Sequence, residues 1–243
     1  MGTKRGIVLG LTIWGLLGTA TPALAQLGPG WTGDASLSGS RTSGNTDTID
    51  LGIRLNLKYN AEKWRHTIRT TADFGRANDK TNKQRVGMSY KLGHDLSDRT
   101  YIFGNADYFY DDFGPFEEGY FLGGGFGYEL TRTDPIQWGI ELGLGFRSQS
   151  EQSPSPVVSE RLAARVASDF DWAFSENVKL YNNSEAQIGD FNTNVWNELG
   201  LTSNLIGNLA ARISFRAEHN TNPPESREGT DTITRFGLVY KMD

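Results

Sequence analysis

Charged residues recur at every second position along several segments, and these are the residues of the chain most able to bind ions or take part in catalysis. Between residues 51 and 59, apolar Leu51, Ile53, Leu55, Leu57 and Tyr59 alternate with polar residues that include Arg54 and Lys58. Because successive side chains of a strand point to opposite faces, the charged side chains of such a segment share one face.

Extending this alternation along the chain places fourteen basic and ten acidic residues on one inward surface. Charges packed this closely need water or partners, because an unpaired buried charge is strongly penalised. They either cross-pair into a network that fills the interior or line a wet channel with a mild preference for anions. The inward set is Arg54, Lys58, Arg65, Arg69, Arg85, Lys91, Arg147, Arg161, Arg165, Lys179, Arg212, Arg216, Arg235, Lys241, Asp50, Asp73, Asp107, Glu129, Glu141, Asp169, Asp171, Glu185, Glu198 and Glu218.

One acidic pair in this set has the spacing of an acid/base pair. Asp169 and Asp171 lie two residues apart and share one face of a strand. Arg161 and Arg165 lie on the same face, so ion pairing is the simpler interpretation.

Histidine is the other residue to test for catalysis, and the chain has three. His66 falls at a lipid-facing rim and His94 beside a turn, while His219 lies near a strand end within reach of Glu225 or Ser226. A nucleophile needs a base at hydrogen-bond distance, and the chain contains neither Gly-x-Ser-x-Gly nor His-Glu-x-x-His. We therefore expect no catalytic residue, metal ion or cofactor, and no enzyme.

Twelve successive segments carry the alternation, and each is about long enough to cross a bilayer as a tilted strand. Short turns and longer loops alternate between them, which places all short turns and both chain termini at one end of the barrel and the longer loops at the other. In hydrocarbon an unpaired backbone group costs several kcal/mol, so the first strand must pair with the last. The sequence therefore predicts a single closed antiparallel up-and-down transmembrane β-barrel of about twelve strands, rather than a soluble all-β domain. The expected strands are 31–42, 47–59, 64–75, 84–94, 99–110, 118–130, 136–148, 160–173, 178–188, 195–205, 209–220 and 231–242.

Aromatic residues gather at the predicted strand ends, as expected for amphipathic rings at headgroup level. Between these two belts we expect an oily face made of Ile68, Val86, Met88, Leu122, Ile140, Leu142, Val166, Leu180, Leu199, Leu201, Ile213 and Leu238. The predicted membrane-interface belt comprises Trp31, Tyr59, Trp64, Tyr128, Trp138, Trp172, Trp196 and Tyr240.

The first 25 residues have the composition of a secretory signal. Lys4 and Arg5 precede an apolar run from Ile7 to Leu17, and Ala23-Leu24-Ala25 is a small-residue cleavage pattern. The apolar run is short for a spanning helix, which makes an N-terminal anchor the weaker alternative. We expect 1–25 to be cleaved and 26–243 to form the barrel, located in the bacterial outer membrane.

Composition excludes several other classes. Removing two basic residues with the signal takes the formal net charge from −5 to −7, and no basic stripe points to nucleic acid. The chain has no cysteine, hence no disulfide or thiolate metal site.

Two short stretches each allow two interpretations. Gly123, Gly124, Gly125 and Gly127, beside Gly143 and Gly145, either clear space for a narrow passage or mark a bend. The acidic stretch 111–118 either binds divalent cations or is a solvated loop, and it fits no defined calcium loop.

The stretch Leu37-Ser38-Gly39-Ser40-Arg41-Thr42-Ser43-Gly44-Asn45-Thr46-Asp47-Thr48 resembles the opening motif of the YdiY-like, or salt-induced outer-membrane protein, family, a domain of unknown function. The strand Gly123-Gly124-Gly125-Phe126-Gly127-Tyr128-Glu129-Leu130 resembles a later hallmark of that family, and the resemblance spans the chain from about Trp31 to its end. It implies an outer-membrane barrel and a link to osmotic or salt-related expression. It carries no agreed substrate or catalytic residues.

The last segment resembles the signal that the barrel assembly machinery reads, with Arg235, Gly237, Tyr240 and Met242 at its positions and no terminal aromatic residue. We accordingly expect contact with outer-membrane lipid, lipopolysaccharide and that machinery, and a monomer. The favoured function is a narrow porin-like channel or envelope-structural protein with a slightly cationic lumen. The alternatives are an enzyme acting on lipid or lipopolysaccharide and a plugged barrel that binds ligands at the surface.

Overall fold

The computed structural model describes residues 29–43, 48–77, 80–152, 157–190, 192–223 and 228–242, without the side chains of 40–43 and 48–49. The predicted signal, residues 44–47 of the opening motif, and Glu225 and Ser226 near His219 lie outside the described residues.

Twelve antiparallel strands form one closed sheet, because β1 pairs with β2 on one side and with β12 on the other. The predicted fold class is thereby confirmed. No helix in the described part of the chain is long and apolar enough to cross a membrane. The strands are β1 (Trp31–Ser43), β2 (Thr48–Ala61), β3 (Trp64–Ala77), β4 (Lys80–Asp95), β5 (Thr100–Asp111), β6 (Phe116–Arg132), β7 (Ile136–Glu151), β8 (Val158–Ala173), β9 (Val178–Gly189), β10 (Thr193–Ile206), β11 (Leu209–Asn220) and β12 (Thr230–Met242).

The observed strands match the predicted ones closely and extend beyond several of them at the loop end. The largest difference is between β3 and β4, where a longer loop from Arg76 to Lys83 was expected. Pairing instead continues to Ala77 and Lys80 through a register shift after Gly75. Polar residues extend the ladder here because backbone groups pair whatever side chain they carry.

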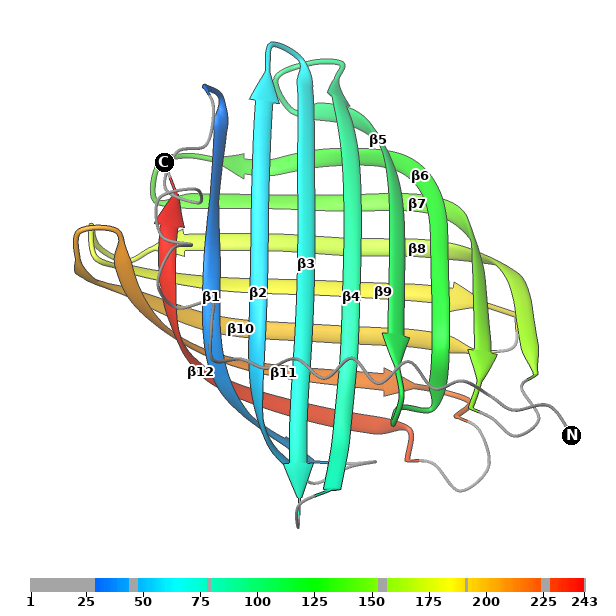
Figure 1. The fold of residues 1–243 in the computed structure, drawn as a ribbon. Coiled ribbons are helices and arrows are strands. Elements are labelled where there is room, and N and C mark those ends of the chain that lie inside the picture. The colour runs from blue at the N-terminus through cyan, green and yellow to red at the C-terminus, as the bar shows by residue number, and fades with distance from the viewer. Residues whose placement is uncertain are drawn as a thin grey trace, which may run out of the picture.

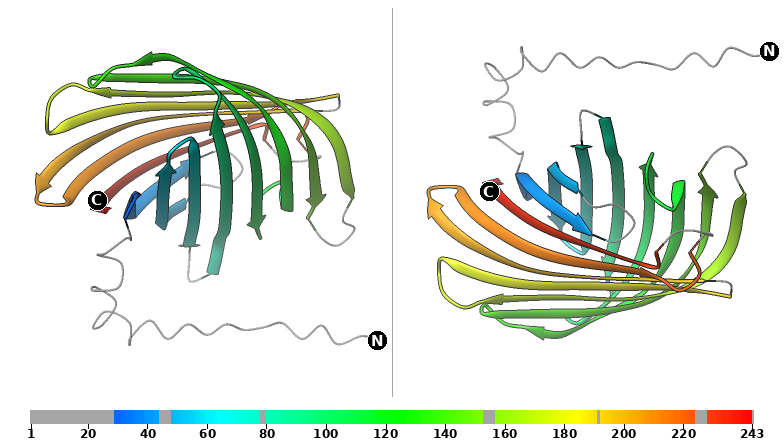
Figure 2. Two further views of the ribbon diagram at one scale, coloured as in Figure 1. Left: turned by 90° about the horizontal axis from the view of Figure 1, so that it is seen from above. Right: turned by 90° about the horizontal axis from the view of Figure 1, so that it is seen from below.

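The strands are steeply tilted, so β1–β4 on one wall cross β6–β11 on the other (Figure 1). Seen from above and from below, the strands form two walls that face each other (Figure 2). Trp31 pairs with Tyr59, and Gly33 with Met242, so the first and last strands begin and end beside the β2–β3 turn. We call this the turn end and the opposite side the loop end.

The two faces of the sheet have the polarity of a membrane barrel. On the outside, Leu122 is 63% exposed and Leu142 is 59% exposed, whereas the inward Glu141 is 2% exposed. Eight members of the predicted oily face are exposed: Met88, Leu122, Leu142, Val166, Leu199, Leu201, Ile213 and Leu238. Ile68, Val86, Ile140 and Leu180 are half-buried. This arrangement suits a hydrocarbon solvent and is the reverse of a soluble domain.

The glycine stretch of β6 is covered by aromatic rings rather than left open. A Cβ on Gly127 would lie 2.0 Å from the Tyr101 ring, and one on Gly123 would lie 2.5 Å from the Phe121 ring. Both rings are buried, at 7% and 3% exposure. Gly124 shares the outward parity of exposed Leu122 and Phe126, whereas Gly123 and Gly125 face inward. Gly123 and Gly127 therefore clear space that the Phe121 and Tyr101 rings occupy, so the interpretation of this stretch as one wall of a passage gains no support.

Candidate functional site: a charged lumen

The interior of the barrel holds one large cavity of about 1140 Å³. Its lining runs from turn-end residues such as Asp95 and Lys241 to loop-end residues such as Asp111 and Asn194. The cavity therefore extends along the barrel from one end to the other.

The charges that line this cavity are nearly balanced, with fourteen basic and thirteen acidic residues. The acidic share exceeds the sequence-based count because rim residues such as Asp34, Glu62 and Asp95 also face the lumen. The basic residues are Arg54, Lys58, Arg65, Arg69, Lys83, Arg85, Lys91, Arg132, Arg147, Arg165, Lys179, Arg212, Arg216 and Lys241. The acidic residues are Asp34, Glu62, Asp95, Asp107, Asp111, Glu129, Asp169, Asp171, Glu185, Glu198, Glu218, Glu228 and Asp231.

A few residues of the predicted inward set lie away from the main cavity. Asp73 and Arg235 line a second, much smaller cavity of about 20 Å³ between β1, β2, β3, β11 and β12. Glu141 is buried among its ion-pair partners, and Asp50 is buried beside Lys83. Arg161 belongs to the inward face near the loop end, but its side chain is 48% exposed and pairs with Asp190 at 3.5 Å.

Two ion pairs cross the lumen between opposite walls. Arg54 on β2 contacts Glu198 on β10 at 2.9 Å, and Arg85 on β4 contacts Glu218 on β11 at 3.3 Å. Arg216 joins them, because its guanidinium lies 3.6 Å from Glu198 and 2.5 Å from Glu218. We call Arg54, Arg85, Glu198, Arg216 and Glu218 the crossing network.

A second cluster centres on buried Glu141 of β7. Its carboxylate accepts hydrogen bonds from Lys91 at 2.6 Å, Arg165 at 2.7 Å and the Tyr101 hydroxyl at 2.8 Å. Arg165 also contacts Glu185 at 2.7 Å. Several donors on one carboxylate offset the cost of burying it, so this cluster holds β4, β5, β7, β8 and β9 together.

Most of the remaining inward charges form simple pairs. Asp169 and Asp171 were expected to pair with Arg161 and Arg165. Instead, Lys179 pairs with Asp171 at 3.0 Å and Lys91 approaches Asp169 at 3.8 Å. The other pairs are Arg65 with Glu129 and Asp95, Lys83 with Asp50, Arg212 with Asp34, and Arg235 with Asp73. Arg147 instead donates to the side chain and backbone oxygens of Asn192.

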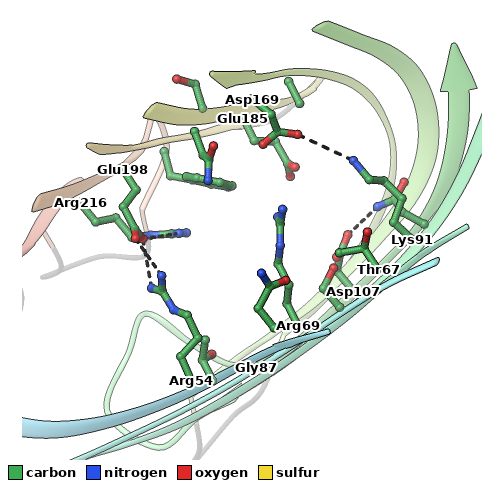
Figure 3. A pocket seen from close by; sticks show the side chains of 18 of the residues that line it. Arg54, Thr67, Arg69, Gly87, Lys91, Asp107, Asp169, Glu185, Glu198 and Arg216 are labelled. Carbon is green, nitrogen blue, oxygen red and sulfur yellow. Dashed lines mark hydrogen bonds and ion pairs between the residues drawn. The ribbon is translucent and has the colours of Figure 1, made fainter. Parts of the chain in front are cut away.

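Lys58 and Arg69 differ from these paired cations. Within the described part of the chain neither makes an ion pair or a hydrogen bond. Figure 3 shows Arg69 extending from its wall into the open lumen, between the Arg54–Glu198 pair and the Lys91–Asp169 pair.

Five residues of the predicted aromatic belt are exposed: Trp64, Tyr128, Trp138, Trp172 and Tyr240, of which Trp64 and Trp138 also border the cavity. Trp31 stacks beside Tyr59 with ring centroids 5.1 Å apart. The assignment of Trp196 to the belt is wrong. Trp196 has the same strand parity as Glu198, lines the cavity, and lies under the Arg216 guanidinium at 4.1 Å. A cationic neighbour stabilises the ring there.

The loop between β5 and β6 folds into the loop-end mouth of the lumen. The Asp111 carboxylate accepts hydrogen bonds from the backbone N–H groups of Phe113 at 3.1 Å and Gly114 at 2.9 Å. Phe113, Gly114 and Pro115 consequently line the cavity. Asp111 thus shapes a turn, and the described residues contain no group of three or more metal-ligating side chains.

The three histidines occupy positions that serve packing. His66 shares a hydrogen bond with Tyr90 at 2.9 Å, and the His94 ring lies 4.4 Å from the Trp64 ring. His219, which is exposed, shares a hydrogen bond with Thr230 at 2.9 Å. The geometry therefore adds nothing in favour of catalysis.

The residues of the expected assembly signal lie on both faces of β12. Arg235 faces inward and pairs with Asp73 at 3.1 Å, while Tyr240 is exposed on the outside. Met242 is buried at 3% exposure, next to Gly33. Recognition by the assembly machinery stays a prediction.

A family profile described as "Protein of unknown function, DUF481" matches residues 35–242. The chain belongs to this family. It is also 23% identical, over 207 residues, to the uncharacterised protein YdiY of Escherichia coli (strain K12), covering 82% of this chain and 79% of that protein. The family resemblance inferred from the sequence is thereby confirmed.

Solved structures with the same architecture include two barrels of known membrane proteins. The NanC porin superposes with a TM-score of 0.58 at 11% identity, over 86% of this chain and all of that one. The translocator domain of the autotransporter NalP from Neisseria meningitidis superposes with a TM-score of 0.51 at 11% identity, over 90% of each chain. At these identities the likeness shows the fold, which is that of outer-membrane barrels.

Proposed function

We propose that this protein is a narrow, non-enzymatic channel of the bacterial outer membrane that lets small polar solutes pass. The observation that carries the proposal is the cavity whose lining joins the turn end to the loop end. The exposed apolar outer face supports insertion in lipid, and the inward charges support a hydrated interior. We expect contacts with outer-membrane lipid and lipopolysaccharide, and a monomer.

The width of this channel is limited by side chains rather than by strand number. The Arg54–Glu198 and Arg85–Glu218 pairs divide the lumen, and the β5–β6 loop reaches into its mouth. We therefore propose a low conductance. The nearly balanced lining gives a weak ion selectivity, and Lys58 and Arg69 tilt it toward anions.

A dependence on salt follows from the same network. Ion pairs in contact with water weaken as ionic strength rises, so we propose that high salt loosens the Arg85–Glu218 contact of the crossing network, whose side chains are 30% and 24% exposed, and widens the passage. This salt dependence would be the physical basis, in this chain, of the osmotic or salt link that the family resemblance implies.

Recording from the purified barrel in a planar bilayer tests the channel. We expect discrete current steps and a reversal potential that favours chloride slightly over potassium. A conductance no greater than that of bare bilayer would refute it. That result would favour the second candidate, a plugged barrel that binds ligands at its surface, which the inward-folded β5–β6 loop supports.

A further inference from the structure

Lys58 and Arg69 form a positive site on one wall of the lumen. They occupy neighbouring inward positions of β2 and β3, where Lys58 pairs with Thr67 and Arg69 with Asn56. Lys58 therefore has a like charge beside it and no ion pair among the described residues. Two like charges held side by side without acidic contacts favour an anionic group from solution.

Asp169 provides a negative group on the opposite wall. In the closed sheet β8 lies six strands from β2, which is as far as a twelve-stranded barrel allows. The only described ion pair of Asp169 is the long contact with Lys91 at 3.8 Å, and its side chain is 40% exposed. Figure 3 shows Asp169 facing the lumen from the wall opposite Arg69.

A gap separates these opposite charges, although the lumen is narrow enough for direct contact elsewhere. Arg54 and Glu198 meet from walls four strands apart. Asp169 has one methylene fewer than Glu198 and makes no contact with Lys58 or Arg69. All three line the cavity, so the space between them is open to a solute.

We propose that this gap is a subsite for small zwitterions, with the solute's carboxylate on Arg69 and Lys58 and its ammonium on Asp169. A guanidinium binds a carboxylate through two parallel hydrogen bonds, and opposite charges across the lumen orient a dipolar molecule. The inference rests on the proposed channel and names the solute class that it favours.

Ligand-detected NMR by saturation transfer on the detergent-solubilised barrel tests binding without requiring conduction. The probes are β-alanine and its neutral isomer lactamide, with propionate and propylammonium as singly charged relatives. We expect β-alanine to bind more tightly than the other three. Arg69→Gln and Asp169→Asn should each weaken its binding by about tenfold, the value of one charge-assisted hydrogen bond.

Lys241→Gln is the matched control, since Lys241 lines the turn end and donates to Asn204 at 2.6 Å. It should leave β-alanine binding unchanged. The double variant Arg69→Asp/Asp169→Arg reverses the two charges and should restore part of the affinity, which a merely misfolded variant would not do. Heat-dependent mobility on a gel confirms that each variant is folded.

The same probes in the planar bilayer separate this inference from the proposed function. β-Alanine should reduce the single-channel current of the wild type, and Arg69→Gln should relieve that block. β-Alanine binding without any conductance would overturn the channel and leave the subsite standing. If the barrel conducts but binds propionate or lactamide as tightly as β-alanine, the subsite is overturned and the channel stands.

Discussion

Arg54 on β2 donates two hydrogen bonds to Glu198 on β10, at 2.9 and 3.2 Å, although 144 residues separate them in the chain. Glu198 also accepts a hydrogen bond from the Tyr181 hydroxyl at 2.8 Å. A single carboxylate thus connects walls that are four strands apart around the barrel. Its position explains how an interior so rich in charge remains ordered.

Replacing Glu198 with Gln should open the lumen and weaken the fold. Arg54 loses its only acidic contact within the described residues, and removing one member of a buried pair costs about 3 kcal/mol. We expect a larger single-channel conductance and a lower midpoint of thermal unfolding. Asp171→Asn is a suitable control, because it breaks a half-exposed pair with Lys179 at the wall. An unchanged conductance in Glu198→Gln would mean that the Arg54–Glu198 pair does not limit the passage.

Replacing Lys83 with Ala should lower the free energy of unfolding far more than replacing Lys179 with Ala. Lys83 pairs with Asp50 where the two side chains are 10% and 0% exposed, whereas Lys179 and Asp171 are 51% and 29% exposed. Lys83→Ala should cost about 3 kcal/mol, because it removes the cation that contacts a buried carboxylate. Lys179→Ala should cost less than about 1 kcal/mol, because water screens the pair. Urea titration of both variants in lipid vesicles measures the difference, and equal losses would contradict the distinction.

Glycine at position 127 should be required for the packing of Tyr101. A Cβ there would lie 2.0 Å from the ring, which would have to move and release its hydroxyl from Glu141. We expect Gly127→Ala to lower the unfolding temperature or prevent folding. Gly104→Ala is the control, since the nearest atom to its Cβ would be a backbone oxygen at 3.8 Å. Heat-dependent gel mobility reports both, and a fully stable Gly127→Ala barrel would show that the ring adapts.

Trp196 should be shielded from lipid, unlike the other tryptophans of the barrel. It lies in the lumen beneath Arg216, whereas Trp172 is exposed on the outer surface. In variants that retain one tryptophan each, brominated lipid should quench Trp172 fluorescence strongly and Trp196 fluorescence little. Strong quenching of Trp196 by brominated lipid would reverse its assignment to the lumen.

Much of the architecture was readable from the sequence, because the period of a strand is two and does not depend on distant residues. The alternation around Leu51 to Tyr59 distinguished inside from outside. Closure followed from the backbone groups that β1 and β12 would otherwise leave unpaired. Trp196 stands at a strand end, as belt residues do, but it shares its strand parity with the inward Glu198. That parity is visible in the sequence and predicts that Trp196 faces the lumen.

The pairing of charges was not readable in the same way. Alternation placed Arg54, Arg69 and Glu198 on one inward surface, but it contains no information on which of them touch. That depends on the tilt and curvature of the strands, which bring Arg54 of β2 to Glu198 of β10 and leave Arg69 without an ion pair among the described residues. The chain by itself determined a sealed barrel with an oily outside and an ionic inside, because both follow from local periodicity and backbone hydrogen bonding. Only the tertiary structure decided which charges cancel and which remain for a solute, because electrostatic contact depends on distance through space.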